Sequence, residues 1–434
     1  MKAFFISFGC KVNQYETEGM KSFFEKNGFD ITNNSKSADA IIINSCTVTS
    51  NGESKVIHAI KRLRRNNPNA VIALTGCLPQ AFPEKASELT DADIITGTKM
   101  RLNLPELVKK ELEQRRHTVC IENYSGTEDF ENLSCTQFRD KTRAFVKIQD
   151  GCNQFCSYCI IPYARGRCRS KPINILKHEV IELAASGHKE IVLVGINLAF
   201  YGSELCIRLP DAAEVCSNVE GIERIRLGSL EPEILTDSDL KRFAALKQFC
   251  PHFHLSLQSG CDRTLKAMNR HYSSSEYYDL VCKIRKYFPE ASITTDIMVG
   301  FPGETEVDFT ASMKFVQKVG FAKLHVFPYS AREGTKAAKM KEQIPADVKY
   351  RRAEQMKGLA AECEKNFLES QVGKVYPVLF ERERSPEFHQ GYTPNYVMVK
   401  IPSENCEKSL RRKIFYVKIV ESKNDCCIGE IVNN

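Results

Sequence analysis

The sequence predicts a multidomain α/β protein: an N-terminal parallel α/β sheet domain, a central partial (β/α)6 barrel and a small C-terminal all-β barrel. Three observations support this fold class. Short apolar runs alternate with helix-like segments at the start, the alternation resumes at Arg143 with six further strands, and the tail alternates like strands alone. The expected divisions are residues 1–122, a polar linker at 123–141, a core at 142–370 and a tail at 371–434.

Four apolar runs are expected as parallel strands of the N-terminal domain, with helices between them. The strands are expected over residues 2–7, 40–44, 70–75 and 92–96, and the helices over 15–27, 50–66 and 83–89. Cys10, Cys46 and Cys77 each follow one of these strands, 36 and 31 residues apart. Because open α/β sheets place ligands at the carboxyl ends of their strands, we expect the three thiols to form one cluster site. The alternative is that they are small buried residues at tight turns.

The central region repeats the strand–helix pattern six times. The strands are expected over 144–148, 190–194, 223–227, 252–257, 292–297 and 323–327, with helices such as 174–186 and 274–287 between them. Six units are fewer than the eight of a closed barrel. Residues at the carboxyl ends of such strands are typically functional.

The loop after the first of these six strands contains Cys152, Cys156 and Cys159 in a CxxxCxxC pattern. It offers three thiolates and no evident fourth ligand, whereas a structural zinc site needs four. Thiolates are preferred ligands of iron–sulfur clusters, and three of them leave one iron of a four-iron cluster open for chemistry. A structural zinc knuckle is the alternative. Arg165 and Arg167 follow the loop, and they could contact a phosphate or a cofactor carboxylate, or lie in a solvated loop.

The tail follows a helical stretch at 347–371 and contains apolar alternation over 372–380, 396–401, 414–420 and 427–432, which predicts a small all-β barrel. Its candidate RNA contacts combine basic residues with aromatic side chains that can stack on bases. These candidates are Arg411, Arg412, Lys413, Tyr392 and Tyr396. The alternative is a solvated turn with core aromatics.

Composition excludes several classes of protein. The 434 residues are 42% apolar and 26% charged, and no apolar run approaches the roughly 20 residues that span a bilayer. The short, interrupted N-terminal run is interpreted as a strand rather than a signal peptide, so we expect a cytoplasmic protein with no membrane partner. In a reducing compartment, 18 cysteines favour metal sites and free thiols over disulfides. The net charge of +7 permits an RNA partner.

The cysteine motifs resemble those of a known family. CxxxCxxC with Tyr158 before its last cysteine is similar to the motif of radical S-adenosylmethionine (SAM) enzymes. Residues 8–18, 44–49 and 75–77 resemble the N-terminal domain of the methylthiotransferases, and the tail resembles a TRAM RNA-binding domain. The runs Gly-Cys-Lys-Val-Asn and Cys-Thr-Val-Thr are similar to those of the enzymes acting on N6-threonylcarbamoyladenosine (t6A) in tRNA.

This resemblance implies two [4Fe-4S] clusters, an auxiliary one on Cys10, Cys46 and Cys77 and a radical SAM one on Cys152, Cys156 and Cys159. It also implies that residues at the strand ends bind SAM. The expected SAM-binding residues are Tyr158, Asn197, Ser229, Gln258 and Asp296.

The implied function is radical methylthiolation of C2 of t6A at tRNA position 37, 3′ of the anticodon, giving 2-methylthio-N6-threonylcarbamoyladenosine and using two SAM per turnover. The implied partners are the tRNA anticodon stem-loop, a low-potential electron donor such as flavodoxin or ferredoxin, and a sulfur donor. Two other substrates remain open: isopentenyladenosine in tRNA and an aspartate of a ribosomal protein. A non-catalytic iron–sulfur RNA-binding protein is the alternative from another class.

Overall fold

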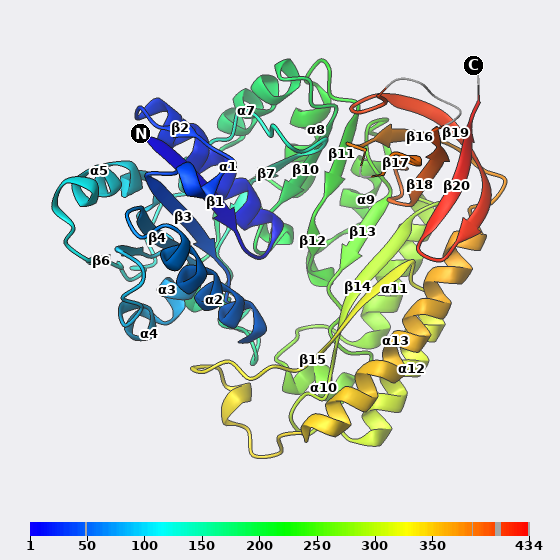
Figure 1. Ribbon diagram of the computed structural model, residues 1–434. Helices are drawn as coiled ribbons and strands as arrows, with labels where there is room; N and C mark the ends of the chain where they lie inside the picture. The colour runs from blue at the N-terminus through cyan, green and yellow to red at the C-terminus, as the bar shows by residue number, and fades with distance from the viewer. Residues whose placement is uncertain (48–49, 384, 404–408, 433–434) are drawn as a thin grey trace.

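The computed structural model describes residues 1–47, 50–383, 385–403 and 409–432. Figure 1 shows a blue N-terminal sheet domain on one side, a green-to-yellow half-barrel in the middle and a red C-terminal barrel at the far end. The multidomain α/β fold class is therefore confirmed. Val48 and Thr49 of the second cysteine motif lie outside the described residues.

The N-terminal domain is one parallel sheet of six strands in the order β2-β1-β3-β4-β5-β6. Two of these, β2 and β6, have only two and three residues, too few to show a pattern in the sequence. The strands are β1 (Lys2–Ser7), β2 (Asp30–Ile31), β3 (Ala40–Ser45), β4 (Val71–Gly76), β5 (Ile94–Thr96) and β6 (Thr118–Cys120). The helices are α1 (Lys11–Lys26), α2 (Ser50–Asn66), α3 (Cys77–Ala81), α4 (Pro83–Ser87) and α5 (Leu104–Gln114).

Helix α1 begins at Lys11, four residues before the expected start at Tyr15. Its first turn is polar apart from Val12, so the apolar periodicity that marks a helix begins later than the helix itself. Val12 and Tyr15 are buried in the apolar core of the central region, and the Tyr15 hydroxyl donates to Glu179 at 2.7 Å. Helix α1 therefore joins the N-terminal domain to the half-barrel.

The half-barrel consists of parallel strands in two sheets, β11-β10-β7 and β12-β13-β14-β15. Gly228 separates β11 from β12, so these two short strands occupy one position and the count of six positions is confirmed. The strands are β7 (Ala144–Lys147), β10 (Glu190–Val194), β11 (Arg224–Leu227), β12 (Ser229–Leu230), β13 (His252–Leu255), β14 (Ser292–Val299) and β15 (Lys323–Pro328). A separate antiparallel pair, β8 (Gln149–Asp150) and β9 (Arg169–Ser170), flanks the cysteine loop.

Helices cover the outer face of the half-barrel, as its long apolar strands require (Figure 1). The helices of this region are α7 (Ile173–Ala185), α8 (Leu209–Ser217), α9 (Asp237–Ala244), α10 (Asp262–Ala267), α11 (Ser274–Tyr287), α12 (Glu306–Val319) and α13 (Ala346–Glu369), and the short α6 (Ile161–Arg165) instead contacts the N-terminal domain. No helix in the described part of the chain is long and apolar enough to cross a membrane.

The C-terminal strands close into a barrel in the order β16-β17-β18-β20-β19, as predicted. The strands are β16 (Val375–Phe380), β17 (Phe388–Tyr392), β18 (Met398–Pro402), β19 (Ile414–Lys423) and β20 (Cys426–Ile431). Strand β17 has the sequence FHQGY, which lacks the apolar alternation that would predict it.

Arginines of the half-barrel hold the small barrel in place through its backbone. Arg224 Nη1 donates to the Tyr392 carbonyl at 2.8 Å, and Arg226 Nη1 donates to the Pro394 carbonyl at 2.8 Å. In return, Arg412 of the small barrel donates to the Phe138 carbonyl at 3.0 Å.

Candidate functional site

Cys10, Cys46 and Cys77 come together at one edge of the N-terminal sheet. Strands β1, β3 and β4 are neighbours, so the three residues follow adjacent strand ends. Cys10 immediately precedes α1, Cys46 follows β3, and Cys77 is the first residue of α3. Burial raises the pKa of Cys77 to about 12. The neighbouring Cys46 and Cys10 contribute to this rise, and Arg165 opposes it. The predicted cluster of three thiols is therefore close enough to interact.

Two residues next to Cys10 in the chain, Gly9 and Asn13, make this close approach possible. Gly9 has φ +97°, and a Cβ there would lie 2.5 Å from the Cys46 Cβ and 2.7 Å from its Sγ. Only glycine fits at this position. The Asn13 side chain donates to the carbonyls of Phe8 and Ser45, both at 2.9 Å, and so ties the ends of β1 and β3 together.

The loop with Cys152, Cys156 and Cys159 curls at the carboxyl end of the half-barrel. Phe155 at its centre has φ +48°, and the Cys159 amide donates to the Cys156 carbonyl at 3.0 Å. Burial raises the pKa of Cys159 to about 12, with the neighbouring Cys156 and Cys152 contributing to this rise, so the three thiols interact electrostatically. Thiols with a raised pKa are protonated at neutral pH. They bind a metal only as thiolates, so metal binding must offset the free-energy cost of removing their protons.

Arg165 links the two groups of cysteines. It lies in α6, six residues after Cys159, and its Nε donates to the Sγ of Cys77 at 3.2 Å. Its Nη2 donates to Asn13 at 2.7 Å and to Glu16 at 3.0 Å. Arg165 is fully buried, so neither a solvated loop nor a contact with phosphate describes it. Arg167 is exposed.

Glu16 is the centre of a buried charge network beneath Arg165. Arg165, Arg101 at 3.1 Å and Lys147 at 2.9 Å surround its carboxylate. Burial alone would raise the pKa of Glu16, but the three cations outweigh burial and lower this pKa to about 2. Removing one partner of a buried charge lowers the free energy of unfolding. Because Glu16 belongs to the N-terminal domain and Lys147 and Arg165 belong to the half-barrel, this network holds the two domains together.

A cavity of about 390 Å³ opens beside Cys159. Three of the five expected SAM-binding residues line it, namely Tyr158, Gln258 and Asp296. The wall is otherwise mostly apolar, as is usual for the binding site of a small molecule. The other lining residues are Cys159, Ile160, Ile161, Met298, Phe327, Pro328 and Ser330.

The remaining two expected residues, Asn197 and Ser229, do not line this cavity. Asn197 is buried, its Nδ2 donates to the Cys152 Sγ at 3.7 Å, and its Oδ1 has no hydrogen-bond partner among the residues that the structure describes. Within the same residues, Gln258 Oε1 is likewise buried without a hydrogen-bond partner. Such orphaned acceptors suit a ligand that donates hydrogen bonds, as the ammonium and ribose hydroxyls of SAM do. Ser229 is exposed, and its Oγ lies 3.1 Å from the Ser256 Oγ.

Two further residues of this site carry no motif in the sequence. Arg270 Nη1 donates to the Cys156 Sγ at 3.5 Å and to Glu231 at 3.2 Å. Burial raises the pKa of Glu231, and Arg270 opposes that shift. Arg270 stands 111 to 118 residues beyond the three cysteines of the loop, so only the folded chain brings them together.

The aromatic residues expected as RNA contacts face the half-barrel. The Tyr396 ring stacks on the rings of Tyr392 and His252, with centroids 4.8 and 4.7 Å away. The guanidinium of Arg143 lies over Tyr392 and Tyr396 at 4.7 and 5.0 Å. This stack closes the end of the half-barrel remote from the cysteine loop.

The basic residues at 411–413 also contact other parts of the chain. Arg412 donates to the carbonyls of Phe138, Lys141 and Ser186, and Arg411 donates to the Arg139 carbonyl at 2.9 Å. These contacts hold the segment before β7 against the small barrel. Lys413 is exposed.

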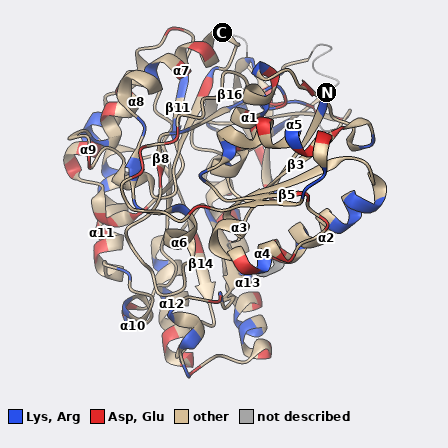
Figure 2. Cartoon of the chain, turned by 90° about the vertical axis from the view of Figure 1, so that its left-hand side faces the viewer, with Lys and Arg blue, Asp and Glu red and all other residues tan. Residues whose placement is uncertain are grey.

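Helix α2 carries a basic face that no sequence motif marks. Figure 2 shows Lys and Arg side by side along this helix at the surface of the N-terminal domain. Its exposed basic residues are Lys55, Lys61, Arg62 and Arg65. The helical period brings residues that are spread through the sequence onto one face.

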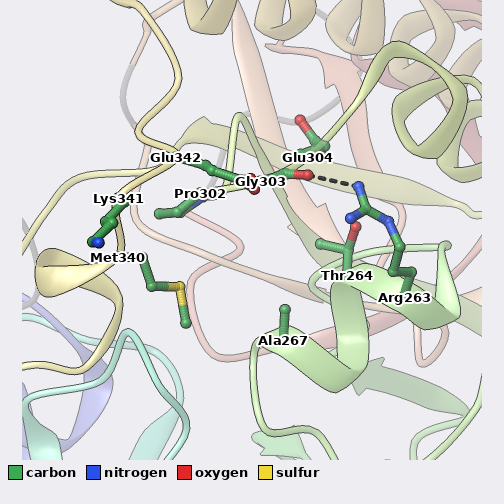
Figure 3. Close-up of a pocket in the computed structure, with 9 residues that line it drawn as sticks. All are labelled: Arg263, Thr264, Ala267, Pro302, Gly303, Glu304, Met340, Lys341 and Glu342. Atoms are coloured by element: carbon green, nitrogen blue, oxygen red, sulfur yellow. Dashed lines mark hydrogen bonds between the residues drawn. The ribbon is translucent and has the colours of Figure 1, made fainter.

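A second cavity, of about 380 Å³, lies outside the half-barrel next to α10 (Figure 3). Arg263 spans it by donating to the Gly303 carbonyl at 2.6 Å. Met340 lines this cavity and belongs to the same apolar cluster as Tyr158 and Met298 of the first cavity. The two cavities thus share an apolar wall, and no cysteine lines the second one among the described residues.

Two parts of the chain match known families. Residues 2–97 match the family described as uncharacterized protein family UPF0004, and residues 146–316 match the radical SAM superfamily. The first match contains Cys10, Cys46 and Cys77, and the second contains Cys152, Cys156 and Cys159. Each group of cysteines thus falls in its own family region.

Relatives match over nearly the whole chain. It is 35% identical to threonylcarbamoyladenosine tRNA methylthiotransferase MtaB of Bacillus subtilis, over 96% of this chain and 93% of the relative. It is 39% identical to the protein of the same name from Thermotoga maritima, over 90% of this chain and 89% of the relative. It is 37% identical to tRNA-2-methylthio-N(6)-dimethylallyladenosine synthase of Caldicellulosiruptor saccharolyticus, over 98% and 92%.

Solved structures share the fold at low identity. The radical SAM methyltransferase TsrM from Kitasatospora setae, solved with cobalamin and a [4Fe-4S] cluster, superposes with a TM-score of 0.59 at 13% identity. The match covers 78% of this chain and 77% of TsrM. It supports the α/β architecture described above.

Proposed function

The chain belongs to the radical SAM tRNA methylthiotransferases, and from that premise we propose how its residues divide the work. It is a tRNA methylthiotransferase that modifies C2 of t6A at position 37, and it uses SAM and a [4Fe-4S] cluster. Relatives that carry this name over nearly their full length support the t6A substrate. The observation that carries the proposal is the pair of cysteine triads joined by Arg165.

Each triad holds one [4Fe-4S] cluster in this proposal. Cys152, Cys156 and Cys159 hold the cluster that binds SAM, which on reduction supplies a 5′-deoxyadenosyl radical. The auxiliary cluster belongs on Cys10, Cys46 and Cys77, at the facing edge of the N-terminal sheet. Because an aromatic C–H bond does not react with protein acids and bases, the task of the protein is to hold both clusters and the base close together.

The side chains around the first cavity orient SAM. Asn197 and Gln258 offer their unpartnered oxygens to its donor groups, and Tyr158 provides an apolar wall. Arg270 places a positive charge next to Cys156 and is itself held by Glu231. The apolar wall excludes water, which protects a radical from side reactions.

The partners in this proposal are the tRNA anticodon stem-loop, a low-potential electron donor such as flavodoxin or ferredoxin, and a sulfur donor. We assign phosphate contacts to the exposed basic face of α2, defined by Lys55, Lys61, Arg62 and Arg65, because phosphate contacts dominate RNA affinity. Lys413 remains a candidate contact on the small barrel.

Mass spectrometry of tRNA nucleosides from strains with and without the gene tests the substrate. We expect 2-methylthio-t6A to disappear on deletion and to return with the wild-type gene. Loss of 2-methylthio-isopentenyladenosine instead would assign the chain to the other tRNA substrate. Intact methylthio-nucleosides with an unmodified ribosomal aspartate would refute tRNA as the substrate.

Iron counting tests the two-cluster arrangement and separates the enzyme from a non-catalytic RNA-binding protein. The anaerobically reconstituted protein is expected to hold about eight irons and to release 5′-deoxyadenosine from SAM on reduction. Four irons and no 5′-deoxyadenosine would contradict the proposal.

A further inference from the structure

Three ligand-type side chains meet on neighbouring strands of the half-barrel, next to the cavity beside Cys159. His254 of β13, Asp296 of β14 and His325 of β15 place their ligand atoms within 4.8 Å of one another. His254 Nε2 lies 3.3 Å from Asp296, and its Nδ1 lies 3.0 Å from the Thr294 hydroxyl. Asp296 also lines the cavity, so this cluster and the cavity are continuous.

The charges around this cluster leave one cation without a close acid. Arg226 pairs with Glu190 at 2.7 Å, and Arg143 pairs with Glu381 at 2.8 Å. Lys11 is exposed and acts electrostatically on both Asp296 and His325. Burial of part of this side chain lowers the pKa of Lys11, and the nearby Arg143 and Arg226 add to that shift.

Lys11 therefore adds a positive charge near Asp296 and His325. Among the described residues no carboxylate lies within ion-pair distance of Lys11, and Asp296 pairs with His254 instead. Its position is fixed by the chain, because it follows Cys10 directly and begins α1.

Two histidines and one carboxylate can also hold a divalent metal ion. The charges argue against a metal here. Lys11 acts electrostatically on both Asp296 and His325, and Asp296 supplies a single negative charge that already accepts from His254. A second positive ion at this point would be repelled, whereas a carboxylate would be attracted.

The geometry points to a carboxylate-binding subsite in which Lys11 supplies the charge and His254 and His325 supply hydrogen-bond donors. This inference rests on the proposed function, and it names the threonyl carboxylate of t6A as the group bound. Asp296 holds His254 in place rather than contacting the carboxylate.

The position of the subsite fits the nucleoside better than it fits the carboxylate of SAM. Lys11 follows Cys10 and begins α1 of the N-terminal domain, whereas the loop of Cys152 and Cys159, where SAM binds in the proposed function, belongs to the half-barrel. A base placed between the two groups of cysteines would bring its N6 substituent to the side of Lys11. An apolar dimethylallyl group would leave Lys11 and the histidines unpaired, and polar sites reject such analogues strongly.

Binding of synthetic anticodon stem-loops to the cluster-loaded protein tests this subsite. One RNA carries t6A, a second carries isopentenyladenosine, and a third carries unmodified adenosine at position 37. We expect Lys11→Met to weaken binding of the t6A RNA about tenfold to a hundredfold, as for loss of a charge-assisted hydrogen bond, and to leave binding of the other two unchanged. Lys11→Arg should restore most of the preference for t6A.

Lys21→Met is the matched control, because Lys21 lies on the same helix and pairs with Glu18 at 2.7 Å. It should leave binding of all three RNAs unchanged. His325→Gln provides a second variant far in sequence from the cysteines, and iron content confirms that both clusters load. We expect His325→Gln to weaken t6A binding severalfold while SAM affinity is retained.

Three results would overturn the inference. If wild type, Lys11→Met and His325→Gln prefer the t6A RNA equally, these residues do not form a subsite for t6A. Weakened SAM affinity with unchanged RNA affinity reassigns it to the SAM carboxylate. A tightly bound divalent metal that is lost in His325→Gln identifies a metal site instead. If the wild-type enzyme instead methylthiolates no t6A RNA at all, the proposed function itself fails, and this outcome is separate from the other three.

Discussion

Arg165 and Cys77 belong to different domains, and the guanidinium Nε of the first donates to the thiol of the second at 3.2 Å. Arg165 follows the cysteine loop of the half-barrel, whereas Cys77 begins a helix of the N-terminal sheet domain. One side chain therefore connects the two proposed cluster sites directly.

Replacing Arg165 is expected to destabilise the protein. Arg165→Met leaves Glu16 and Asp150 buried with fewer cations, which should cost about 3–5 kcal/mol of unfolding free energy. Arg167→Met is the matched control two residues away, where the side chain is exposed. This variant should change the free energy of unfolding by less than about 0.5 kcal/mol. Denaturant unfolding of both variants measures the difference. Equal stabilities would show that the network around Glu16 does not hold the domains together.

Removing one auxiliary ligand separates the two reactions. Cys46→Ala should still cleave SAM, because the loop of Cys152, Cys156 and Cys159 is intact, but it should form no methylthio product. Chromatography of 5′-deoxyadenosine and of tRNA nucleosides from the same reaction measures both. A methylthio product from this variant would show that Cys46 is not a cluster ligand.

Gly9 offers a test of geometry without touching a cysteine. Gly9→Ala places a methyl group 2.5 Å from the Cys46 Cβ, so we expect the protein to load about four irons instead of about eight. Gly28→Ala is the control for backbone strain alone, since Gly28 has φ +85° but open space around its Cβ. Gly28→Ala should lower the free energy of unfolding by about 1–2 kcal/mol and leave the iron content unchanged. Full iron loading of Gly9→Ala would contradict the role given to this glycine.

His188 predicts a specific dependence of stability on pH. Burial, together with the nearby Arg412 and Arg411, lowers the pKa of His188 from 6.5 to about 4, although its contact with the Thr142 carbonyl opposes the shift. The unfolded chain thus binds a proton at higher pH than the folded protein does. The stability due to neutral His188 is complete above pH 6.5 and is lost as the pH falls towards 4, by roughly 3 kcal/mol at most.

Unfolding free energies of wild type and His188→Gln between about pH 7 and 4 test this dependence. The wild type should lose stability more steeply, because glutamine does not titrate. His178→Gln, at an exposed position of α7, should follow the wild-type curve. Parallel curves for wild type and His188→Gln would rule out the proposed contribution.

The basic face of α2 predicts salt-dependent RNA binding. The triple variant Lys61→Ala, Arg62→Ala and Arg65→Ala should bind anticodon stem-loops more weakly, whatever the base at position 37. The slope of log affinity against log salt should fall by about 0.7 for each phosphate that the variant no longer neutralises. Removing three exposed lysines elsewhere, Lys314, Lys357 and Lys365, provides a control with the same change of net charge. An equal effect of both triple variants would indicate net charge rather than a specific surface.

The backbone architecture is predictable from the sequence because apolar periodicity is a local property. The half-barrel strands lie within a few residues of their expected bounds, and the strand ends that periodicity predicts already bring Cys77 beside Cys46. Strand β17 and the early start of α1 are not predictable in this way, because their residues are polar.

The contacts that join distant parts of the chain are not predictable from the sequence. Arg165 has the local context of a loop residue, because its partners Glu16 and Asn13 stand about 150 residues earlier. Tyr396 is expected to stack on RNA bases, yet its ring stacks on His252 of the half-barrel. An aromatic or basic side chain shows its chemistry in the sequence, but its partner is chosen by the tertiary fold.

The small C-terminal barrel is held by hydrogen bonds to its main-chain oxygens, as the contacts of Arg224 and Arg226 show. Every amino acid carries such an oxygen. Substitutions at Tyr392, Thr393 or Pro394 that keep the local backbone path therefore leave the docking acceptors in place. Away from Arg411, Arg412 and the stacked Tyr392 and Tyr396, the outer surface of this barrel can thus be re-engineered for other RNA sequences without redesigning its attachment to the catalytic core.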